Sequence, residues 1–543
     1  MKIYPLWHCV VILFFFSCNK KCLIAPDTEQ IVTAKTAQPL FDSTEPEIHI
    51  NLTDTIVPAN AISVKTFGTV GNGVTDDSNA LQKALNSGNT LVFPAGTYII
   101  NKTLNVKANT KIYGAVGAVI KTGTNMKGTL LTLGRYFYLK DANDCVINNI
   151  KFRQSTQSFK FAKWSSACIY LENSPNGRFT YNFFDFNLPY SNTGFVAIWA
   201  GGSGTRNTLI KGNRLISAGI EYAENGASGT TVEANYISNA PADGLVAHGN
   251  TPEYCTGNLV TNNVIENSGY MGIEDWGNID GTIIRNNTIK GTGKNDANHD
   301  AIGISAVGVN TQVTNNSITD AVFYYIEVAG SHNLLVENNV IYDNKKQAMG
   351  IIINFTGTMP AVSILKGTII KNNTINNCFK GVAVEGDFSP NVEIVSNTVN
   401  NPLFEGINVD TACPSNFTIT IKDNNIQFTT PNERERKGMQ LYSNLAHGAG
   451  DQNISLINNT LTYAEAATGG PGLEFGIEVG IDNTILNGNK ITGNNIKGSQ
   501  LPLKAITSNY APTQNVSFIN NTVTGAVTEL ALFTIKTQTG NNF

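Results

Sequence analysis

The chain has 543 residues, well above the usual size of one globular domain, so we expect either several domains or one elongated array of repeats. Charged residues make up only 14% of the chain and glycine occupies 50 positions, which argues against a helical protein because glycine is a poor helix former. The net charge of −4 provides no basic excess, so no nucleic-acid partner is expected.

The first residues have the pattern of an export signal. Lys2 precedes the apolar run CVVILFFF at 9–16, which is too short for an ordinary membrane-spanning helix. Ser17-Cys18 then resembles the end of a bacterial lipoprotein signal, so we predict a signal over residues 1–18 and lipidation at Cys18. This lipid would be the membrane attachment and would hold the protein at the bacterial outer membrane, on either side of it. The alternative is a plain secretory signal and a secreted protein.

Residues 19–60 are rich in Thr, Pro, Asp, Glu and Gln and lack periodicity, which predicts a flexible tether. The folded body is expected over 61–543. It opens with a segment at 75–88 that predicts a short amphipathic helix capped by Thr75 or Asp76 and ended by Gly88. The apolar residues on its inner face are Ala80, Leu81, Ala84 and Leu85. We expect this helix to cover the first strands of the body.

One repeat dominates the body: an asparagine followed closely by an aliphatic residue. Intervals are typified by the 22 residues from Asn213 to Asn235 and the 24 from Asn263 to Asn287. The repeat positions are Asn213, Asn235, Asn263, Asn287, Asn316, Asn339, Asn373, Asn397, Asn425, Asn459, Asn495 and Asn521, with looser copies at Asn149 and Asn182. We interpret each unit as one coil of three short strands whose apolar side chains are buried only when about fourteen coils stack.

The stacked coils predict an all-β fold, a right-handed parallel β-helix with neighbouring coils about 4.8 Å apart. An asparagine at the same turn of every coil can pass amide hydrogen bonds along the stack. Asparagine also tolerates the left-handed backbone of a sharp turn. We therefore assign these asparagines a structural role.

Residues 62–114 contain ISVKTFGTVGNGVTDDSNALQKAL, then LVFPAGTYII, then IYG, and this series resembles the N-terminal region of pectate-lyase-superfamily β-helix proteins. The resemblance implies a right-handed β-helix and a polysaccharide partner. It also implies a structural role for Asp76 and Asp77, which match the acidic pair that starts the family's helix. Pectate-lyase catalytic motifs and the polygalacturonase motifs Asn-Thr-Asp and Gly-His-Gly are missing, so the resemblance does not specify a reaction.

A second motif, glycine followed by a branched aliphatic residue, recurs in most coils and predicts a strand whose next residue points outward. The outward positions are Glu221, Val246, Glu274, Ser305, Glu327, Ile352, Ala383, Asn408, Gln440 and Glu478. Asp243 and His248 flank Val246 with the same parity. Asp275 has inward parity and is expected to be a hydrogen-bonded core acid or to lie in a bulge. We predict as catalytic groups Glu221, Asp243, His248, Glu274 and Glu327.

Acids beside aromatic rings suit glycoside cleavage, in which one carboxyl group protonates the leaving oxygen and another attacks or activates water. The predicted sugar-binding aromatics are Trp199, Tyr222, Tyr270, Trp276 and Tyr324. Asp243 and Glu274, on adjacent rungs about 4.8 Å apart, would suit retention, whereas Glu221 and Glu274, about 9.6 Å apart, would suit inversion. We favour inversion slightly.

Several alternatives stay open. The clustered glutamates could bind calcium, or each could be an ordinary solvated residue. The outward positions contain no lysine or arginine to neutralise a uronate, which argues against a metal-free polysaccharide lyase. A calcium-assisted lyase, an epimerase and a non-catalytic carbohydrate-binding or adhesive surface protein remain candidates. The sugar, its linkage and the oligomeric state are not specified.

Overall fold

The structure is a computed structural model, and the chain divides into two units, residues 1–48 and 49–543. The described residues are 57–126, 134–155, 166–190, 194–249, 252–295, 301–329, 333–355, 364–386, 389–411, 417–430, 436–442, 452–464, 474–493, 503–508 and 513–543. The predicted export signal, the lipidation site Cys18 and most of the predicted tether lie outside them.

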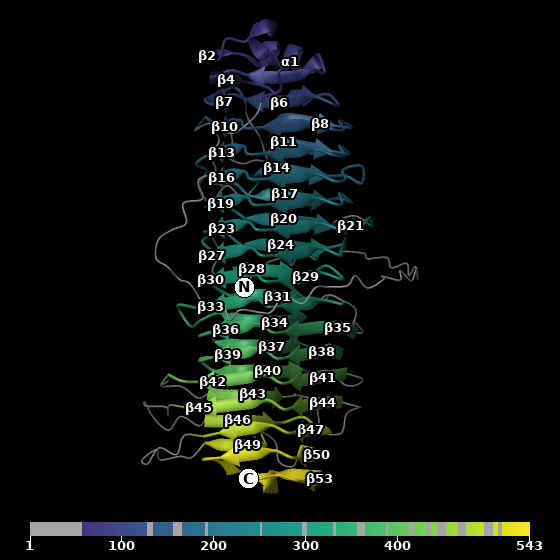
Figure 1. The fold of residues 1–543 in the computed structure, drawn as a ribbon, viewed down its shortest axis with the longest axis vertical. Coiled ribbons are helices and arrows are strands. Elements are labelled where there is room, and N and C mark those ends of the chain that lie inside the picture. The colour runs from purple at the N-terminus through teal and green to yellow at the C-terminus, as the bar shows by residue number, and fades with distance from the viewer. Residues whose placement is uncertain are drawn as a thin grey trace, which may run out of the picture. The chain divides into compact units, whose positions relative to one another are not determined.

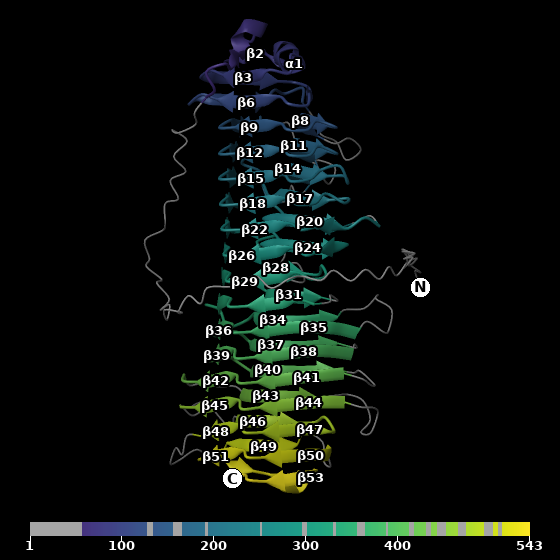
Figure 2. The same cartoon turned by 45° about the vertical axis from the view of Figure 1, so that its right-hand side comes forward.

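Three long parallel sheets form the second unit, and its coils follow one another in chain order (Figures 1 and 2). Among the described residues, sheets 1, 2 and 3 hold 18, 17 and 16 strands. One coil contributes β17 (Ile220–Glu224) to sheet 3, β18 (Thr231–Glu233) to sheet 1 and β19 (Tyr236–Ser238) to sheet 2. The next coil repeats this order with β20 (Leu245–Gly249), β22 (Leu259–Thr261) and β23 (Val264–Glu266). The predicted parallel β-helix is therefore confirmed.

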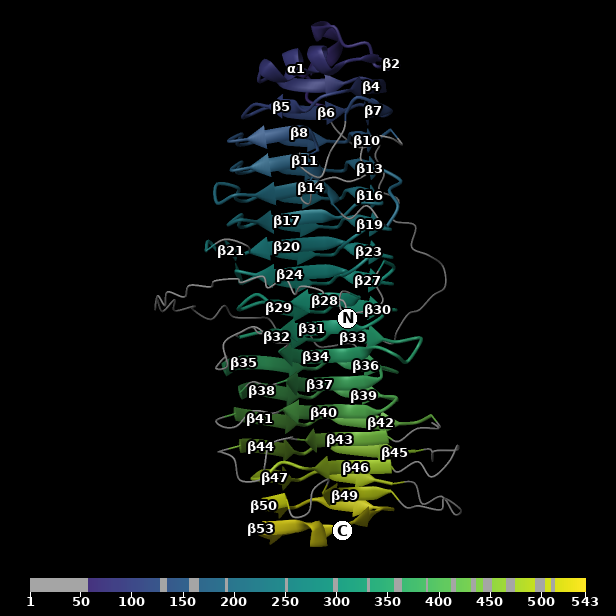
Figure 3. The same ribbon diagram turned by 180° about the vertical axis from the view of Figure 1, so that it is seen from behind.

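Sheet 3 carries the outward positions singled out in the sequence, and Figure 3 shows its strands from behind. Its strands are β5 (Leu104–Val106), β8 (Arg135–Lys140), β11 (Ser166–Glu172), β14 (Phe195–Gly201), β17, β20, β24 (Ile273–Gly277), β28 (Ile302–Ala306), β31 (Tyr324–Ala329), β34 (Met349–Phe355), β37 (Lys380–Gly386), β40 (Glu405–Thr411), β43 (Arg436–Tyr442), β46 (Glu474–Val479), β49 (Lys504–Ser508) and β52 (Val527–Thr528). The sheets hold more rungs than the fourteen predicted, because the first coils form without the asparagine motif.

The core runs continuously through the stack because inward side chains from successive rungs lie directly above one another. In sheet 1, one such column is formed by residues that are all fully buried, Ile210, Val232, Val260, Ile284 and Val313. A single coil would leave both faces of these side chains in water. Burial is therefore a property of the stack, as expected for a repeat architecture.

The asparagine ladder is present. In each step the side-chain amide donates to the side-chain oxygen of the next asparagine at 2.9–3.1 Å, and the backbone N–H donates to the same oxygen. The members are Asn182, Asn213, Asn235, Asn263, Asn287, Asn316, Asn339, Asn373, Asn397, Asn424, Asn459, Asn489, Asn521 and Asn541. The structural role predicted for these asparagines is confirmed.

Three details of the predicted ladder were wrong. Asn424 and not Asn425 is the member in its coil, and Asn489 takes the place assigned to Asn495, which lies outside the described residues. Asn149 donates instead to the Gly114 carbonyl.

The left-handed backbone belongs to the residue before each ladder position, as at Asn262 with φ 57°, because that residue turns the chain while the next one points inward.

The predicted capping helix is α1 (Ser78–Asn86), and its inner face buries Leu81, Ala84 and Leu85. Asp77 and not Thr75 or Asp76 stands at the N-cap position, while Asp76 accepts the Ser78 N–H at 3.0 Å. Gly88, with φ 68°, follows the end of the helix. The helix lies against β5, where the Gln82 side chain exchanges two hydrogen bonds with the Asn105 backbone. No helix in the described part of the chain is long and apolar enough to cross a membrane.

Candidate active site

Sheet 3 brings the predicted outward positions into one column. Glu221 pairs with Val246, which pairs with Glu274, and the column continues through Ser305 to Glu327. Glu221, Glu274 and Glu327 therefore lie on one face of the β-helix at intervals of two rungs. The register that the glycine motif predicted places acids from distant parts of the chain side by side.

His248 bridges two of these acids. Its Nδ1 lies 3.4 Å from Glu221 Oε1 and its Nε2 lies 3.1 Å from Glu274 Oε2, and all three side chains are at most 13% exposed. Burial by itself lowers the pKa of His248, but the hydrogen bonds and negative charges of Glu221 and Glu274 outweigh this effect and raise the pKa to about 10. The imidazole is thus a cation at neutral pH, which suits it to holding carboxylates and not to accepting a proton.

Glu224 joins this group through an irregularity in β17. The register shifts between Glu221 and Ala223, so that Glu224 pairs with His248 and also faces outward. Trp199 donates its indole N–H to Glu224 Oε2 at 2.5 Å. Burial and then the nearby charge of Glu221 raise the pKa of Glu224 to about 7, against the opposing effects of Trp199 and His248. We call Glu221, Glu224, His248 and Glu274 the acid cluster.

Sequence reasoning missed Glu224 because it assumed strict alternation along the strand. The signal in the sequence was the number of residues from the motif glycine to the outward ionisable residue, which differs between two successive rungs. Six residues, Gly-Ile-Glu-Tyr-Ala-Glu, run from the motif glycine to Glu224, whereas five, Gly-Leu-Val-Ala-His, run from the next motif glycine to His248. An extra residue within one rung of a regular stack indicates a bulge.

The prediction that Tyr222 contacts sugar was wrong. Its side chain points inward, as alternation from Glu221 requires, and is fully buried in the core. Asp275 is the hydrogen-bonded core acid that its parity predicted: it is fully buried and accepts the Thr311 hydroxyl at 2.8 Å. Burial raises the pKa of Asp275 to about 7, although the hydrogen bond from Thr311 opposes the shift.

Asp243 and Glu327 make other contacts. The buried carboxylate of Asp243 accepts the Met271 N–H at 2.9 Å, and this hydrogen bond holds the chain just before β24. Glu327 accepts the Ser305 hydroxyl at 2.9 Å, two rungs from Glu274. The structure therefore places Glu221, His248 and Glu274 together, whereas Asp243 contacts the Met271 backbone and Glu327 contacts Ser305.

The predicted aromatic side chains differ in exposure. Trp276, in register with His248, is 49% exposed, and Tyr270 is half-buried. Trp199 is only 4% exposed because it stacks on Tyr170 with ring centroids 4.0 Å apart, and Tyr324 packs against its neighbour Phe323. Trp276 is thus the predicted aromatic with the largest open surface for a sugar ring.

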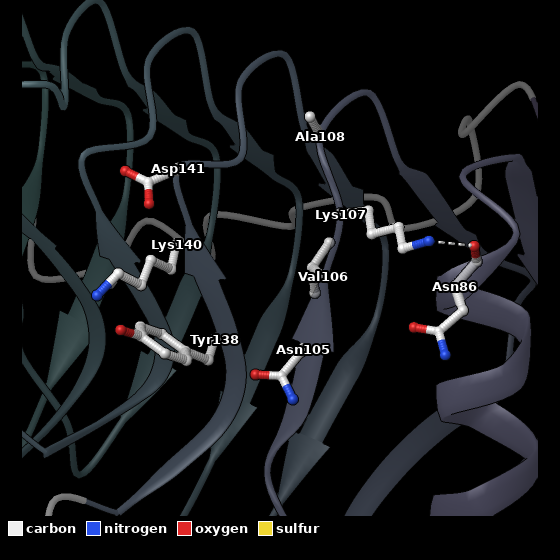
Figure 4. A pocket seen from close by; sticks show the side chains of 8 residues that line it. All are labelled: Asn86, Asn105, Val106, Lys107, Ala108, Tyr138, Lys140 and Asp141. Atoms are coloured by element: carbon white, nitrogen blue, oxygen red, sulfur yellow. Dashed lines mark hydrogen bonds between the residues drawn. The ribbon is translucent and has the colours of Figure 1, made fainter.

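The same column continues away from the acid cluster toward α1. It passes from Glu221 through Trp199, Tyr170 and Tyr138 to Asn105. A depression of 660 Å³ lies at this end, between the end of α1 and strands β5 and β8 (Figure 4). Its lining residues are Asn86, Asn105, Val106, Lys107, Ala108, Tyr138, Lys140 and Asp141. The amides, the ring and the cations are groups that can bind sugar hydroxyls or acidic substituents.

Lysines do occur on sheet 3, in the column three residues before the outward positions. Lys380 lies 3.0 Å from Glu405, and Lys437 lies 2.9 Å from Glu478. The sequence argument against a metal-free lyase considered the neighbouring column alone. These lysines are already neutralised by carboxylates of the same face, so a uronate would have to compete for them.

Calcium was an open alternative for the acids. Across the described ranges, no three or more His, Cys, Asp or Glu side chains are arranged to hold a metal ion. The imidazole of His248 instead lies between Glu221 and Glu274. A hydrogen-bonding cation of the protein thus occupies the position that a calcium ion would need.

The raised pKa of His248 predicts a pH-dependent contribution to stability. Because the folded-state pKa of about 10 lies above the ordinary value of 6.5, the stabilisation is complete below about pH 6.5 and is lost as the pH rises through 10. We expect the difference in Tm between the parent and His248→Asn to narrow over this range, as measured by circular dichroism. A constant difference would show that His248 is not protonated in the folded state.

Known proteins resemble this chain in two segments and in fold. Residues 61–179 match the family model described as rhamnogalacturonase A/epimerase, pectate lyase-like, and residues 218–426 and 301–464 match the right-handed β-helix region. The pre-neck appendage protein of Bacillus phage phi29 is 44% identical over 62 residues, which cover 11% of this chain and 7% of that protein. Plasmin and fibronectin-binding protein A of Streptococcus pneumoniae is 36% identical over 73 residues, which cover 12% and 10%. The chain thus spans a small part of these relatives.

Solved structures extend the similarity over most of the chain. An α-1,3-glucanase catalytic unit from Streptomyces thermodiastaticus matches with a TM-score of 0.50 and 15% identity, over 73% of this chain and 68% of that one. A tailspike protein of E. coli bacteriophage HK620, in complex with a pentasaccharide, matches with a TM-score of 0.50 and 13% identity, over 82% and 78%. The stacked coils, the ladder and these matches agree: the chain is a pectate-lyase-like protein of the right-handed parallel β-helix fold.

Proposed function

We propose that the protein is an exported glycoside hydrolase that cleaves a polysaccharide at the acid cluster. The observation that carries this proposal is the position of Glu224, whose pKa is raised to about 7, on the same sheet face as Glu221 of its own strand and Glu274 two rungs away. Glycoside hydrolysis needs one protonated and one ionised carboxyl group. The glucanase and the tailspike with its pentasaccharide support a polysaccharide as the ligand of this fold.

In this proposal Glu224 is the general acid and Glu274 the general base. Glu224 gives its proton to the glycosidic oxygen as the carbon–oxygen bond breaks. A water molecule attacks the anomeric carbon and passes a proton to the carboxylate of Glu274, whose Oε2 lies 3.1 Å from His248 Nε2. Two rungs, about 9.6 Å, separate β17 from β24, and this spacing is near the range of about 6.5–9.5 Å that leaves room for a water molecule in inverting enzymes.

The polysaccharide would lie along the outer column of sheet 3. Trp276 offers an open ring beside the acid cluster, and the depression near Tyr138 lies three rungs from β17 on the same column. At about 4.8 Å a rung, this distance is about 14 Å. A chain of several sugars can therefore contact both places, which favours a polymeric over a small substrate.

Hydrolysis is tested by incubating the full chain with a panel of polysaccharides and measuring new reducing ends. The parent should release reducing ends from at least one glycan, and Glu274→Gln should not. Glu233→Gln is the matched control, because this acid lies on sheet 1 in an ion pair with Lys211 and should leave activity unchanged. Products that absorb near ~235 nm would indicate elimination, favour the lyase and overturn hydrolysis.

A second candidate is carbohydrate binding without catalysis. The hydrogen bonds of Glu221 and Glu274 to His248, with little exposure of the three side chains, favour it, because groups that satisfy one another can be purely structural. Tight glycan binding with no products from the parent, and equal binding by Glu274→Gln, would establish the binder. Epimerisation would appear as a changed sugar composition without new ends.

Trp276 provides a test of the binding surface. We expect Trp276→Ala to raise KM about tenfold while kcat stays within twofold, because an exposed ring contributes about 1.5–3 kcal/mol of apolar contact when a sugar covers it. Initial rates over a range of polysaccharide concentrations measure both constants. Tyr181→Ala, which removes a ring with 42% exposure from the turn between sheets 1 and 2, is the control. An unchanged KM for Trp276→Ala would place the substrate elsewhere.

A further inference from the structure

The bulge in β17 turns two consecutive residues, Tyr222 and Ala223, toward the core, and both are fully buried. The irregularity appears in the pairing of β17 with β14 and again in its pairing with β20. It therefore belongs to β17 itself. Without it, strict alternation would turn Glu224 inward, away from His248.

The buried phenol of Tyr222 interacts with Asp275, which lies two rungs further along sheet 3. The negative charge of Asp275 raises the pKa of Tyr222, after the larger effect of burial, while the Tyr222 hydroxyl and Asp275 Oδ1 are both buried without a hydrogen-bond partner. The residues in register with Asp275 are small, namely Ala223, Ala247 and Ala306. Gly308 adds space, because a Cβ there would lie 2.8 Å from Asp275 Oδ2. The core thus contains room for one large polar pair behind the acid cluster.

This pair is unusual for its surroundings. Asp275 accepts the Thr311 hydroxyl, and the Tyr222 and Thr282 hydroxyls lie in the same core without a hydrogen-bond partner. Burying a carboxyl group and a phenol costs stability that well-packed apolar residues would not. A contribution to stability is therefore a poor explanation for the pair. Its position directly behind Glu224 and Glu274 favours a role in placing those acids.

We propose that Tyr222 and Asp275 are positioning residues that fix the bulge in β17 and thereby hold Glu221 and Glu224 against His248. The Tyr222 ring anchors the bulge on the inner side of the sheet, and Asp275 is the charged group that interacts with its hydroxyl. The inference rests on the proposed function for its catalytic meaning, while the arrangement of side chains that it describes can be measured without a substrate.

The test compares Tyr222→Phe and Asp275→Asn with Tyr325→Phe. Tyr325 is a matched control: it is also fully buried, and its hydroxyl donates to the Tyr342 carbonyl at 3.1 Å. We expect Tyr222→Phe and Asp275→Asn to lower kcat at least tenfold with KM within twofold, and to shift the basic limb of the pH–rate profile. Tyr325→Phe should lower Tm by a similar amount and shift neither.

A second readout does not depend on turnover. In protein with ¹⁵N-labelled histidine, the His248 resonance is assigned from its loss in His248→Asn, and its titration is followed by NMR. If the bulge relaxes, Glu221 and Glu224 move away and the pKa of His248 should fall from about 10 by at least about 1. The other titratable groups that interact with this buried pair are Cys255 and Glu274, and both remain in each variant.

The possible outcomes separate the two proposals. If Tyr222→Phe and Asp275→Asn behave like Tyr325→Phe in both kinetics and His248 titration, the pair only fills the core and the inference is overturned. If no glycan is cleaved by the parent but the His248 titration still shifts in both variants, the positioning of the acids stands while the hydrolase proposal fails. Asp275→Asn keeps the size and an acceptor oxygen, so it provides a folded variant if Tyr222→Phe unfolds.

Discussion

Replacing Glu224 with glutamine is expected to lower kcat about 10²–10⁴-fold with little change in KM, because general acid catalysis contributes about that much and an amide cannot give up a proton. Glutamine keeps the size of the side chain and an oxygen to accept the Trp199 indole N–H, so the fold should be preserved. Glu337→Gln is the matched control, since this acid lies on sheet 1 in an ion pair with Lys371, away from the proposed substrate path. Full activity of Glu224→Gln would contradict the assignment.

The same residue predicts the basic limb of the pH–rate profile. A general acid must be protonated, and the pKa of Glu224 is raised to about 7, so activity should fall as the pH rises through that value. The profile of kcat/KM measured from pH 4 to 9 would show this limb. In Glu224→Gln the limb should disappear from any residual activity. A profile that instead rises through pH 7 would assign Glu224 to the role of base.

Replacing Asn287 with alanine is expected to cause the largest loss of stability, about 3–6 kcal/mol. Its side-chain oxygen accepts both the backbone N–H and the side-chain amide of Asn263, and its own amide donates to the Val260 carbonyl. Alanine would leave the Asn263 N–H and the Val260 carbonyl without this partner, at about 1–3 kcal/mol each, and would remove one of the three acceptors of the Asn263 amide, at about 1 kcal/mol. Thermal and urea unfolding followed by circular dichroism would measure the effect.

Asn344→Ala is the control for this prediction, because Asn344 is exposed and hydrogen-bonds to Asp320 at the surface. Its change should stay within about 0.5 kcal/mol. Because stacked repeats can unfold in parts, the midpoint should be compared with hydrogen exchange in the coils on either side of Asn287. Equal effects of the two substitutions would show that the ladder does not hold the coils together.

The fold was accessible from the sequence because each coil repeats the same local requirements. The ladder asparagine needs a partner one coil away, and the motif glycine needs to be small, since a Cβ at Gly272 would lie 2.6 Å from the Gly303 carbonyl oxygen. Such requirements recur once in each coil and can be recognised in the sequence, so they predicted the register that places Glu221 and Glu274 in one column. The errors at Asn425 and Asn495 arose where two asparagines stand close together and only the turn geometry distinguishes them.

Only part of the acid cluster could be predicted from the sequence. Alternation predicted the outward side chains of Glu221, His248 and Glu274, but it could not say that His248 would become a cation held between two carboxylates. It also could not place Glu224 on the outer face, because a single inserted residue reverses parity for the rest of a strand. Exposure was equally inaccessible: Trp199 and Trp276 have similar patterns, yet stacking on Tyr170 buries the first.

By itself, the sequence determined the stacked architecture and the face on which the acids gather, since both follow from motifs that repeat from coil to coil. The tertiary structure alone decided which of those acids touch, which are buried, and which proton is held near neutral pH. These properties depend on contacts between rungs that lie tens of residues apart, where one bulge in β17 moves a carboxyl group from the core to the open face.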